Sequence, residues 1–328
     1  MGKFTTCELP DDGLYVGELD ENGLPHSEMA TATWGNGTSY RGAWRHGKMF
    51  GVGTIYENGL AKYRGFWWNG EMIHKFGEGD IPSQEEKLPE NKKKIVALLV
   101  GCDYPNSKAL LPNCVADVDA VGAKMRQIGA DVTVLRNASE DEIIKELERL
   151  NEKGKVEVDA AIFYFSGHGN QVGPWHFLIP DSGSPICLER DVLIGLHDTK
   201  YKNLIIIHDA CNVLEPLSAK ELEKLNDKKN ERNWVNYQNL LHDRNILYAF
   251  SALDGQAATA RSRHENGMYA LALMEYIHQR NLPVMKMFDL VSSFVKAYSS
   301  KEFGVIAEVP HVEHATFDYD FCLYEPYE

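Results

Sequence analysis

The sequence predicts an α/β domain with a mainly parallel six-stranded sheet flanked by helices, preceded by a small all-β module of repeated hairpins. The apolar runs Ala160–Phe165 and Leu204–Ile207 lack polar alternation, which is typical of parallel strands buried on both faces. Strand patterns alternate with helix patterns four times between residues 95 and 211. A tyrosine–glycine pattern recurs in residues 13–79. A chain of 328 residues is long enough for both domains.

The repeated pattern consists of Tyr15-Val-Gly17, Tyr40-Arg-Gly42-Ala-Trp44 and Tyr63-Arg-Gly65-Phe-Trp67, at intervals of 25 and 23 residues. Alternating Tyr-x-Gly-x-Trp predicts a strand, and the glycines that follow it predict the tight turn of a hairpin. The pattern resembles MORN repeats, in which each unit is one hairpin. We therefore expect a MORN module over residues 1–79, whose aromatic side chains form a core between the hairpins.

Residues 80–93 are polar, contain two prolines and lack periodicity, so we expect a linker there and a second domain over residues 94–328. Ser139 and Glu142 form a predicted capping box, and Asn113 is a predicted helix cap. The expected elements are a strand at 95–101, a helix at 114–128, a strand at 131–135, a helix at 139–151, the strand before His168, a loop through Trp175, a helix at 189–197, the strand before Cys211, a strand at 246–251, helices at 266–279 and 283–298, and a last strand at 314–323.

His168 and Cys211 follow the two buried strand runs. Because the carboxyl ends of parallel strands share one edge of a sheet, these two side chains should lie side by side. A cysteine thiol has a pKa of about 8.5 and needs a neighbouring imidazole to become a thiolate near neutral pH. Gly169 allows backbone N–H groups to approach a substrate carbonyl. Each residue alone is more often structural, but together they predict nucleophilic catalysis.

The segments Ser166-Gly-His-Gly169 and Asp209-Ala-Cys211 resemble the motifs of caspase-like cysteine peptidases, namely caspases, metacaspases and paracaspases, over about residues 94–323. The resemblance implies the caspase-like fold and a thiol protease of the peptidase C14 type, with no cofactor or metal in its chemistry. It also implies regulated proteolysis in signalling, cell death or defence. Cys211 would attack the carbonyl carbon, His168 would protonate the leaving amine, and the Gly169 and Cys211 N–H groups would hold the oxyanion.

Asp209 bears on substrate choice because side chains alternate along a strand, so Asp209 and Cys211 point the same way. Metacaspases and paracaspases carry an acid two residues before the cysteine and cleave after Arg or Lys, and Asp209 follows that pattern. Caspases that cut after aspartate have a glutamine there and arginines around the pocket. The pocket segment that begins at Ser251 offers no arginine.

Asp117 is a second candidate pocket acid. It lies in Cys114-Val-Ala-Asp117, which resembles the paracaspase segment whose aspartate joins the pocket, but it could equally complement only a helix N-terminus. Two carboxylates would suit the planar fork of arginine better than the point charge of lysine. A further acid of animal paracaspases would fall near Ala257 and is absent, which leaves the strength of the basic preference open.

Activation is expected to involve two regions. The charged stretch after the cysteine is either a solvated helix or a self-cleavage region, with cut points at Lys220, Lys224, Lys228, Lys229 or Arg232. In caspases and paracaspases the last strand pairs two subunits, so a homodimer is expected through residues 314–323.

The net charge of −14 argues against a nucleic-acid partner, which leaves protein substrates with a basic residue before the cut and a protein or lipid partner for the repeats. The six scattered cysteines, the lack of a membrane-length apolar run and the lack of a signal peptide predict the cytoplasm. Met1-Gly2-Lys-Phe-Thr-Thr6 fits the N-myristoylation pattern, so membrane association stays open.

Two other functions stay open. One is a catalytically weak scaffold whose repeats recruit partners, because Asn212-Val213 departs from the Arg-Gly or His-Ser-Gly of better-known relatives. The other is a caspase proper, which would cut after aspartate.

Overall fold

The computed structural model forms two compact units, Met1–Glu86 and Lys87–Glu328. It describes residues 5–75, 90–108, 110–111, 113–153, 156–172, 175–193, 196, 200–210, 245–252, 266–303, 310–314 and 317–326. Residues 80–89 of the expected linker lie outside the described residues, as do the first four residues of the myristoylation pattern.

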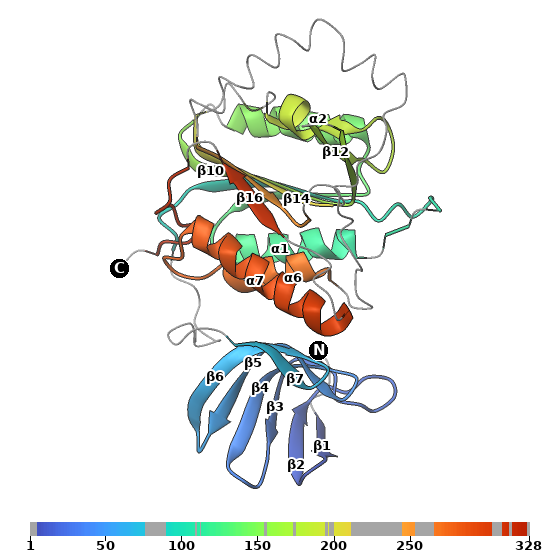
Figure 1. The fold of residues 1–328 in the computed structure, drawn as a ribbon, viewed down its shortest axis with the longest axis vertical. Helices are drawn as coiled ribbons and strands as arrows, with labels where there is room; N and C mark the ends of the chain where they lie inside the picture. The colour runs from blue at the N-terminus through green and yellow to red at the C-terminus, as the bar shows by residue number, and fades with distance from the viewer. Residues whose placement is uncertain are drawn as a thin grey trace, which may run out of the picture. The chain divides into compact units, whose positions relative to one another are not determined.

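The N-terminal unit is a single antiparallel sheet of seven strands in sequential order (Figure 1). The three tyrosine–glycine segments lie on the second, fourth and sixth strands, each of which pairs with the strand that follows it. The strands are β1 (Thr5–Leu9), β2 (Gly13–Gly17), β3 (Ser27–Thr33), β4 (Thr38–Arg45), β5 (Lys48–Glu57), β6 (Leu60–Trp68) and β7 (Glu71–Lys75).

Tyrosine rings lying over glycines explain the repeated pattern. A Cβ atom added to Gly42 would lie 2.5 Å from the Tyr40 hydroxyl, and one added to Gly53 on the next strand would lie 2.2 Å from it. The Tyr40 ring also meets the edges of Trp44 and Trp67, at centroid distances of 5.8 and 5.3 Å. Both tryptophans and Tyr40 are buried in one cluster. The repeated aromatics therefore form the core of this unit.

The second unit is built on a six-stranded sheet in the order β16-β15-β14-β10-β8-β9. A mainly parallel sheet was expected; five strands are parallel to one another and β16 runs antiparallel to β15, so the sheet is mixed. The central strands are buried along almost their whole length, as their apolar runs require. The strands are β8 (Ile95–Gly101), β9 (Asp131–Arg136), β10 (Val158–Ser166), β14 (Tyr201–Asp209), β15 (Asn245–Phe250) and β16 (His311–His314).

Helices cover both faces of this sheet. In Figure 1, α1, α6 and α7 lie on one side of β10 and β14, while α2 and β12 lie on the other. The described helices are α1 (Cys114–Gln127), α2 (Glu140–Lys153), α6 (Met268–Tyr276) and α7 (Val284–Phe303). None of the described helices is both long enough and apolar enough to cross a membrane.

The two predicted caps have opposite outcomes. The capping box before α2 is confirmed, since the Ser139 N–H donates to Glu142 Oε2 at 2.9 Å and the Glu142 N–H donates to Ser139 Oγ at 3.3 Å. The side-chain cap by Asn113 is wrong, because Asn113 has a left-handed backbone with φ of 83° and makes no capping bond. The Asp103 carboxylate accepts the Val115 N–H at 3.0 Å in its place.

The segment after His168 was expected to be a loop, which is wrong. It forms a three-stranded sheet of β11 (His168–Val172), β12 (Trp175–Ile179) and β13 (Ile186–Cys187). The β-branched and aromatic content of the middle strand favours this pairing. The expected helix at 189–197 begins one residue earlier, as the π-helix η1 (Leu188–Val192). Residues 194–195 and 197–199 lie outside the described residues.

The expected last strand at 314–323 is also wrong, because the edge strand β16 ends at His314. Residues 321–324 are buried within their own unit. Cys322 and Pro283 form an isolated antiparallel β-bridge there, and the Asn281 N–H donates to the Tyr324 carbonyl at 2.9 Å. Because the side chains of residues 321–324 are buried in the core of their own unit, these residues are not available to pair with a second subunit.

Candidate active site

The ends of β10 and β14 meet at one edge of the central sheet. Ser166 and Asp209 are register partners in the last row of this parallel pair. The Gly167 N–H donates to the Asp209 carbonyl at 3.3 Å, and the Cys102 N–H donates to the Ser166 carbonyl at 2.9 Å. The residues that follow the two strands therefore leave the sheet from neighbouring points.

His168 is held at this edge by Tyr104. The His168 N–H donates to the Tyr104 hydroxyl at 2.7 Å, and that hydroxyl donates to the Ile179 carbonyl at 2.6 Å. The Tyr104 and His168 rings also lie 4.6 Å apart, tilted by 39°. Tyr104 itself has a positive φ of 54°, which is uncommon for an aromatic residue and turns the chain after β8 toward the histidine. Tyr104 thus fixes both the backbone and the ring of His168.

Gly169 brings the histidine segment against the chain just before Cys211. A Cβ atom added to Gly169 would lie 2.8 Å from the Ala210 Cβ and 2.8 Å from the His208 Cε1. The close approach requires glycine, because real Cβ atoms do not come so near other carbons. Cys211 is bonded to Ala210 but lies outside the described residues, as do the five expected self-cleavage positions Lys220, Lys224, Lys228, Lys229 and Arg232.

Four of the described cysteines have thiol pKa values above the ordinary range. Burial raises the pKa of the Cys102 thiol to about 11. Burial, followed by the charge of Glu189, raises the pKa of Cys187 well above its ordinary value. The Cys322 and Cys7 thiols also have raised pKa values because of burial. A thiol that stays protonated at neutral pH is a poor nucleophile.

Two buried carboxylates lie at the same strand ends. Asp117 on α1 is fully buried, and its carboxylate accepts the Gly267 N–H at 2.7 Å and the Ser166 hydroxyl at 3.3 Å. Asp209 is 6% exposed and accepts the Tyr164 hydroxyl at 3.1 Å. Tyr164 and Ser166 are two residues apart on β10, so both carboxylates lie on the same face of the sheet.

The carboxylate of Asp117 reaches outside its own helix. Its described partners are Ser166 at the end of β10, together with the Asn266 side chain and the Gly267 N–H at the start of α6. Asp117 therefore joins the sheet edge to the N-terminus of a helix distant in sequence, and not to the first turn of α1 alone. On the same face, burial and then the charge of Asp209 raise the pKa of Tyr269 well above its ordinary value.

A scan of the sequence against family models matches the caspase domain (Peptidase_C14) over residues 94–321, which is more than two thirds of the chain. The chain belongs to the caspase-domain peptidase family. Membership implies cysteine-peptidase hydrolase chemistry and protein substrates. A comparison with curated proteins found no match.

Solved structures share the caspase fold with this chain. Caspase-1 from Spodoptera frugiperda matches with a TM-score of 0.52 and 14% identity, over 75% of this chain and 96% of that one. Protein GSU0716 from Geobacter sulfurreducens matches with a TM-score of 0.50 and 16% identity, over 72% of this chain and 100% of that one. At identities this low, the structural similarity establishes the fold alone. Substrate specificity must be argued from the residues of the site.

Ser251, the third expected pocket residue of this caspase domain, lies directly after β15. Its N–H donates to the His208 carbonyl at 3.1 Å, which continues the pairing of β15 with β14 by one residue. Its side chain is fully buried, and its hydroxyl has no hydrogen-bond partner among the described residues. The neighbouring position Ala257 lies outside the described residues.

Sequence reasoning missed a buried polar cluster on the opposite face of the caspase-domain sheet. Glu189, only 3% exposed, accepts the His176 N–H at 3.0 Å and lies 2.7 Å from His176 Nδ1. The His176 ring lies 6.4 Å from that of His208, whose side chain packs against Gly169. The sequence did carry one sign of this cluster, the histidine at position 208 within an otherwise apolar run. A buried imidazole requires polar groups nearby, because burying a polar group without a hydrogen-bond partner costs free energy.

Proposed function

We propose that this caspase-domain protein is a cysteine endopeptidase that cleaves proteins after basic residues, with arginine preferred to lysine. The observation that carries the proposal is the pair of buried carboxylates, Asp117 and Asp209, on one face of the sheet where β10 and β14 end. A guanidinium with its fork of N–H donors can bond two carboxylates at once, whereas an ammonium is a point charge. An aspartate side chain would be repelled there.

The proposed chemistry is acyl transfer by Cys211 and His168. The thiolate attacks the carbonyl carbon of the peptide bond, and His168 protonates the departing amine. The N–H groups of Gly169 and Cys211 hold the oxyanion, and water then hydrolyses the thioester. Two observations support these roles: Tyr104 fixes His168 at the edge of the sheet, and Gly169 packs against Ala210, the residue before the nucleophile.

A set of fluorogenic peptides that differ only in the residue before the cut tests this specificity. We expect the highest kcat/KM for arginine, a lower value for lysine, and negligible cleavage after aspartate or alanine. Cys211→Ala and His168→Ala proteins should be inactive and folded, which excludes a contaminating peptidase. Efficient cleavage after aspartate would reject the basic specificity, while activity of Cys211→Ala would reject the nucleophile.

We also propose that residues 1–79, of which the structure describes 5–75, are a MORN module that localises or regulates the peptidase. Three tyrosine–glycine segments on alternate strands and the core of tyrosine and tryptophan rings support this proposal. A shortened chain should begin at Glu90, because the Asn91 side chain bonds the carbonyls of Ile128 and Leu323 at 3.0 and 2.8 Å. We expect it to react with a covalent arginine-based inhibitor as the full chain does. A folded but unreactive short chain would mean that the module contributes to catalysis.

A further inference from the structure

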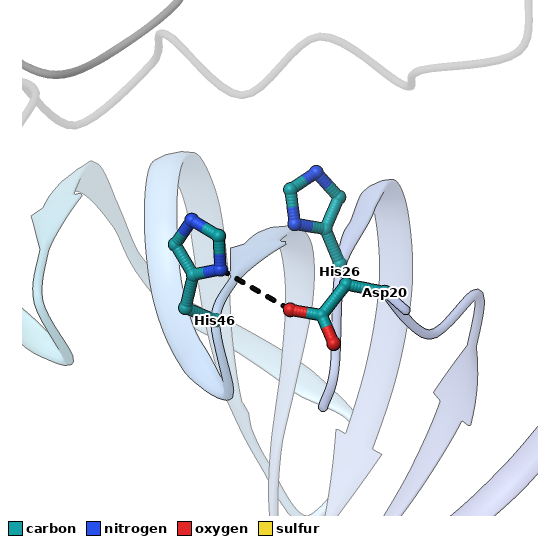
Figure 2. Close-up of side chains that lie close together, drawn as sticks. All are labelled: Asp20, His26 and His46. Carbon is teal, nitrogen blue, oxygen red and sulfur yellow. Dashed lines mark hydrogen bonds and ion pairs between the residues drawn. The ribbon is translucent and has the colours of Figure 1, made fainter. Parts of the chain in front are cut away.

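Three potential metal ligands meet at one end of the N-terminal unit, remote in sequence from the peptidase site. Asp20 lies in the turn after β2, His26 lies just before β3, and His46 lies in the turn between β4 and β5 (Figure 2). One ligand atom from each residue lies within 4.8 Å of the ligand atoms of the other two. We propose that Asp20, His26 and His46 bind a divalent transition-metal ion, with zinc as the first candidate.

The backbone holds the two turns in place without a metal. Leu19 and Pro25 form an antiparallel bridge, which brings Asp20 and His26 to the same end of the sheet. The Gly47 N–H donates to the Pro25 carbonyl at 2.9 Å and so fastens the turn that carries His46 to the turn that carries the other two ligands. A pre-formed scaffold of this kind lowers the cost of ordering the ligands on binding.

Asp20 is already oriented as a ligand. Its Oδ1 accepts the N–H groups of Asn22 and Leu24 at 3.0 and 2.9 Å, which leaves Oδ2 directed at His46 (Figure 2). Both carboxylate oxygens of Asp20 are therefore held in place by neighbouring groups. Only 10% of this side chain is exposed.

His26 supplies the observation that an ordinary ion pair does not explain. Its Nδ1 atom is shielded from solvent and has no hydrogen-bond partner within the described part of the chain. Figure 2 shows this nitrogen on the side of the ring that faces His46 and Asp20. A buried polar atom without a partner costs free energy, and a bound ion is one of the features that account for such atoms in native proteins.

The distances are close to those of a coordinated ion. His46 Nδ1 lies 3.1 Å from Asp20 Oδ2, and the two histidine rings lie 5.4 Å apart at 68°. Two ligands of a tetrahedral zinc ion are about 3.4 Å apart when each bond is about 2.0–2.1 Å long. The His46–Asp20 spacing is about 0.3 Å shorter than this value, and the ligand atom of His26, which lies within 4.8 Å of the other two, would need to approach them by at most about 1.4 Å.

The ligand types select the metal. Calcium and magnesium prefer oxygen donors, whereas two imidazoles with one carboxylate suit zinc and its first-row neighbours. The His46 side chain is 75% exposed, so the ion could enter from solvent and keep water as its fourth ligand. The bound ion would fasten the first hairpin turn to the second, which is a structural role.

The test measures zinc binding to the full chain after treatment with a chelator, in a Cys211→Ala background so that the catalytic thiol does not bind zinc. We expect one ion per chain with a Kd of about 10 μM or tighter at pH 7.5. Binding should weaken in acid, because metal ligands bind in their deprotonated forms. Cobalt in place of zinc should give visible absorption bands typical of tetrahedral nitrogen and oxygen ligation.

His46→Asn is the decisive variant, because asparagine tolerates the left-handed backbone of position 46, where φ is 46°. We expect zinc affinity to fall by about 10²-fold or more, and the zinc-dependent rise in unfolding temperature to disappear. Asp20→Asn, which keeps an acceptor for Asn22 and Leu24, should also weaken binding, whereas His278→Asn, just after α6 in the other unit, should not. Millimolar binding, or binding unchanged by His46→Asn, would overturn the proposal.

Discussion

The Tyr104 hydroxyl offers the sharpest test of how His168 is positioned. Tyr104→Phe keeps the aromatic ring against His168 and removes only the oxygen that joins the His168 N–H to the Ile179 carbonyl. The His168 N–H and the Ile179 carbonyl then both lose this partner in a partly buried position. A stranded backbone group costs about 1–3 kcal/mol, and some rehydration is expected at this edge, so unfolding should become easier by about 2 kcal/mol.

The effect on catalysis should exceed the effect on folding. A displacement of a catalytic group by about 1 Å can lower the rate by about 10²-fold, so we expect kcat of Tyr104→Phe to fall by roughly 10-fold or more, with little change in KM. Denaturant unfolding gives the first quantity, and hydrolysis of an arginine peptide gives the second. Active-site titration with a covalent inhibitor corrects kcat for inactive protein.

Tyr201→Phe is the matched control. Tyr201 is the first residue of β14, at the end of the strand opposite to the active site, and its side chain is as buried as that of Tyr104. The Tyr201 hydroxyl donates to the Leu150 carbonyl. Its loss should lower stability by about 1–2 kcal/mol and leave kcat unchanged. If the two variants lose equal stability and Tyr104→Phe keeps full kcat, then Tyr104 does not position the histidine.

Three further outcomes are expected. Asp209→Asn, which keeps an acceptor at the pocket, should lower kcat/KM for arginine peptides by about 10²-fold, and an unchanged value would exclude Asp209 from substrate binding. Gly53→Ala should destabilise the N-terminal unit by about 1–3 kcal/mol, because the added Cβ would overlap the Tyr40 ring. Gly35→Ala is the control, since an added Cβ there has no atom within 4 Å, and calorimetry should show no loss of stability for it. Mass spectrometry of the active chain beside Cys211→Ala should find fragments ending within 220–232 in the active sample alone, and an intact chain at full activity would show that self-cleavage is not required.

Local sequence signals predicted the central strands whose carboxyl ends meet at the candidate active site. The strand at 95–101 has the bounds of β8, because a buried parallel strand is apolar throughout and ends where polar residues begin. The Ser139–Glu142 capping box was predictable because both of its bonds are formed within four residues. The expectation that Asp117 and Asp209 share a substrate pocket came from alternation along the strand and from the resemblance to paracaspases, and it stays a prediction.

Features that depend on contacts distant in sequence were not predictable. Residues 314–323 have the apolar content of a strand, but their apolar side chains fill the base of their own core, where Asn91 binds the Leu323 carbonyl. Asn113 has the residue type of a helix cap, yet Asp103 satisfies the first turn of α1. Tyr104 gave no local sign of its role, since its partners lie 64 and 75 positions away.

The tyrosine rings of the N-terminal unit restrict how such a module can change length during evolution. Because Tyr40 covers glycines on two successive strands, inserting one residue within β5 would turn its side chains to the opposite face and place one beneath the ring. The turns at Gly23, Gly59 and Gly70 have open space around them, so extra residues could enter there. We therefore expect relatives to gain or lose whole hairpins, or to vary at the turns, while the spacing of tyrosine and glycine along each strand stays fixed.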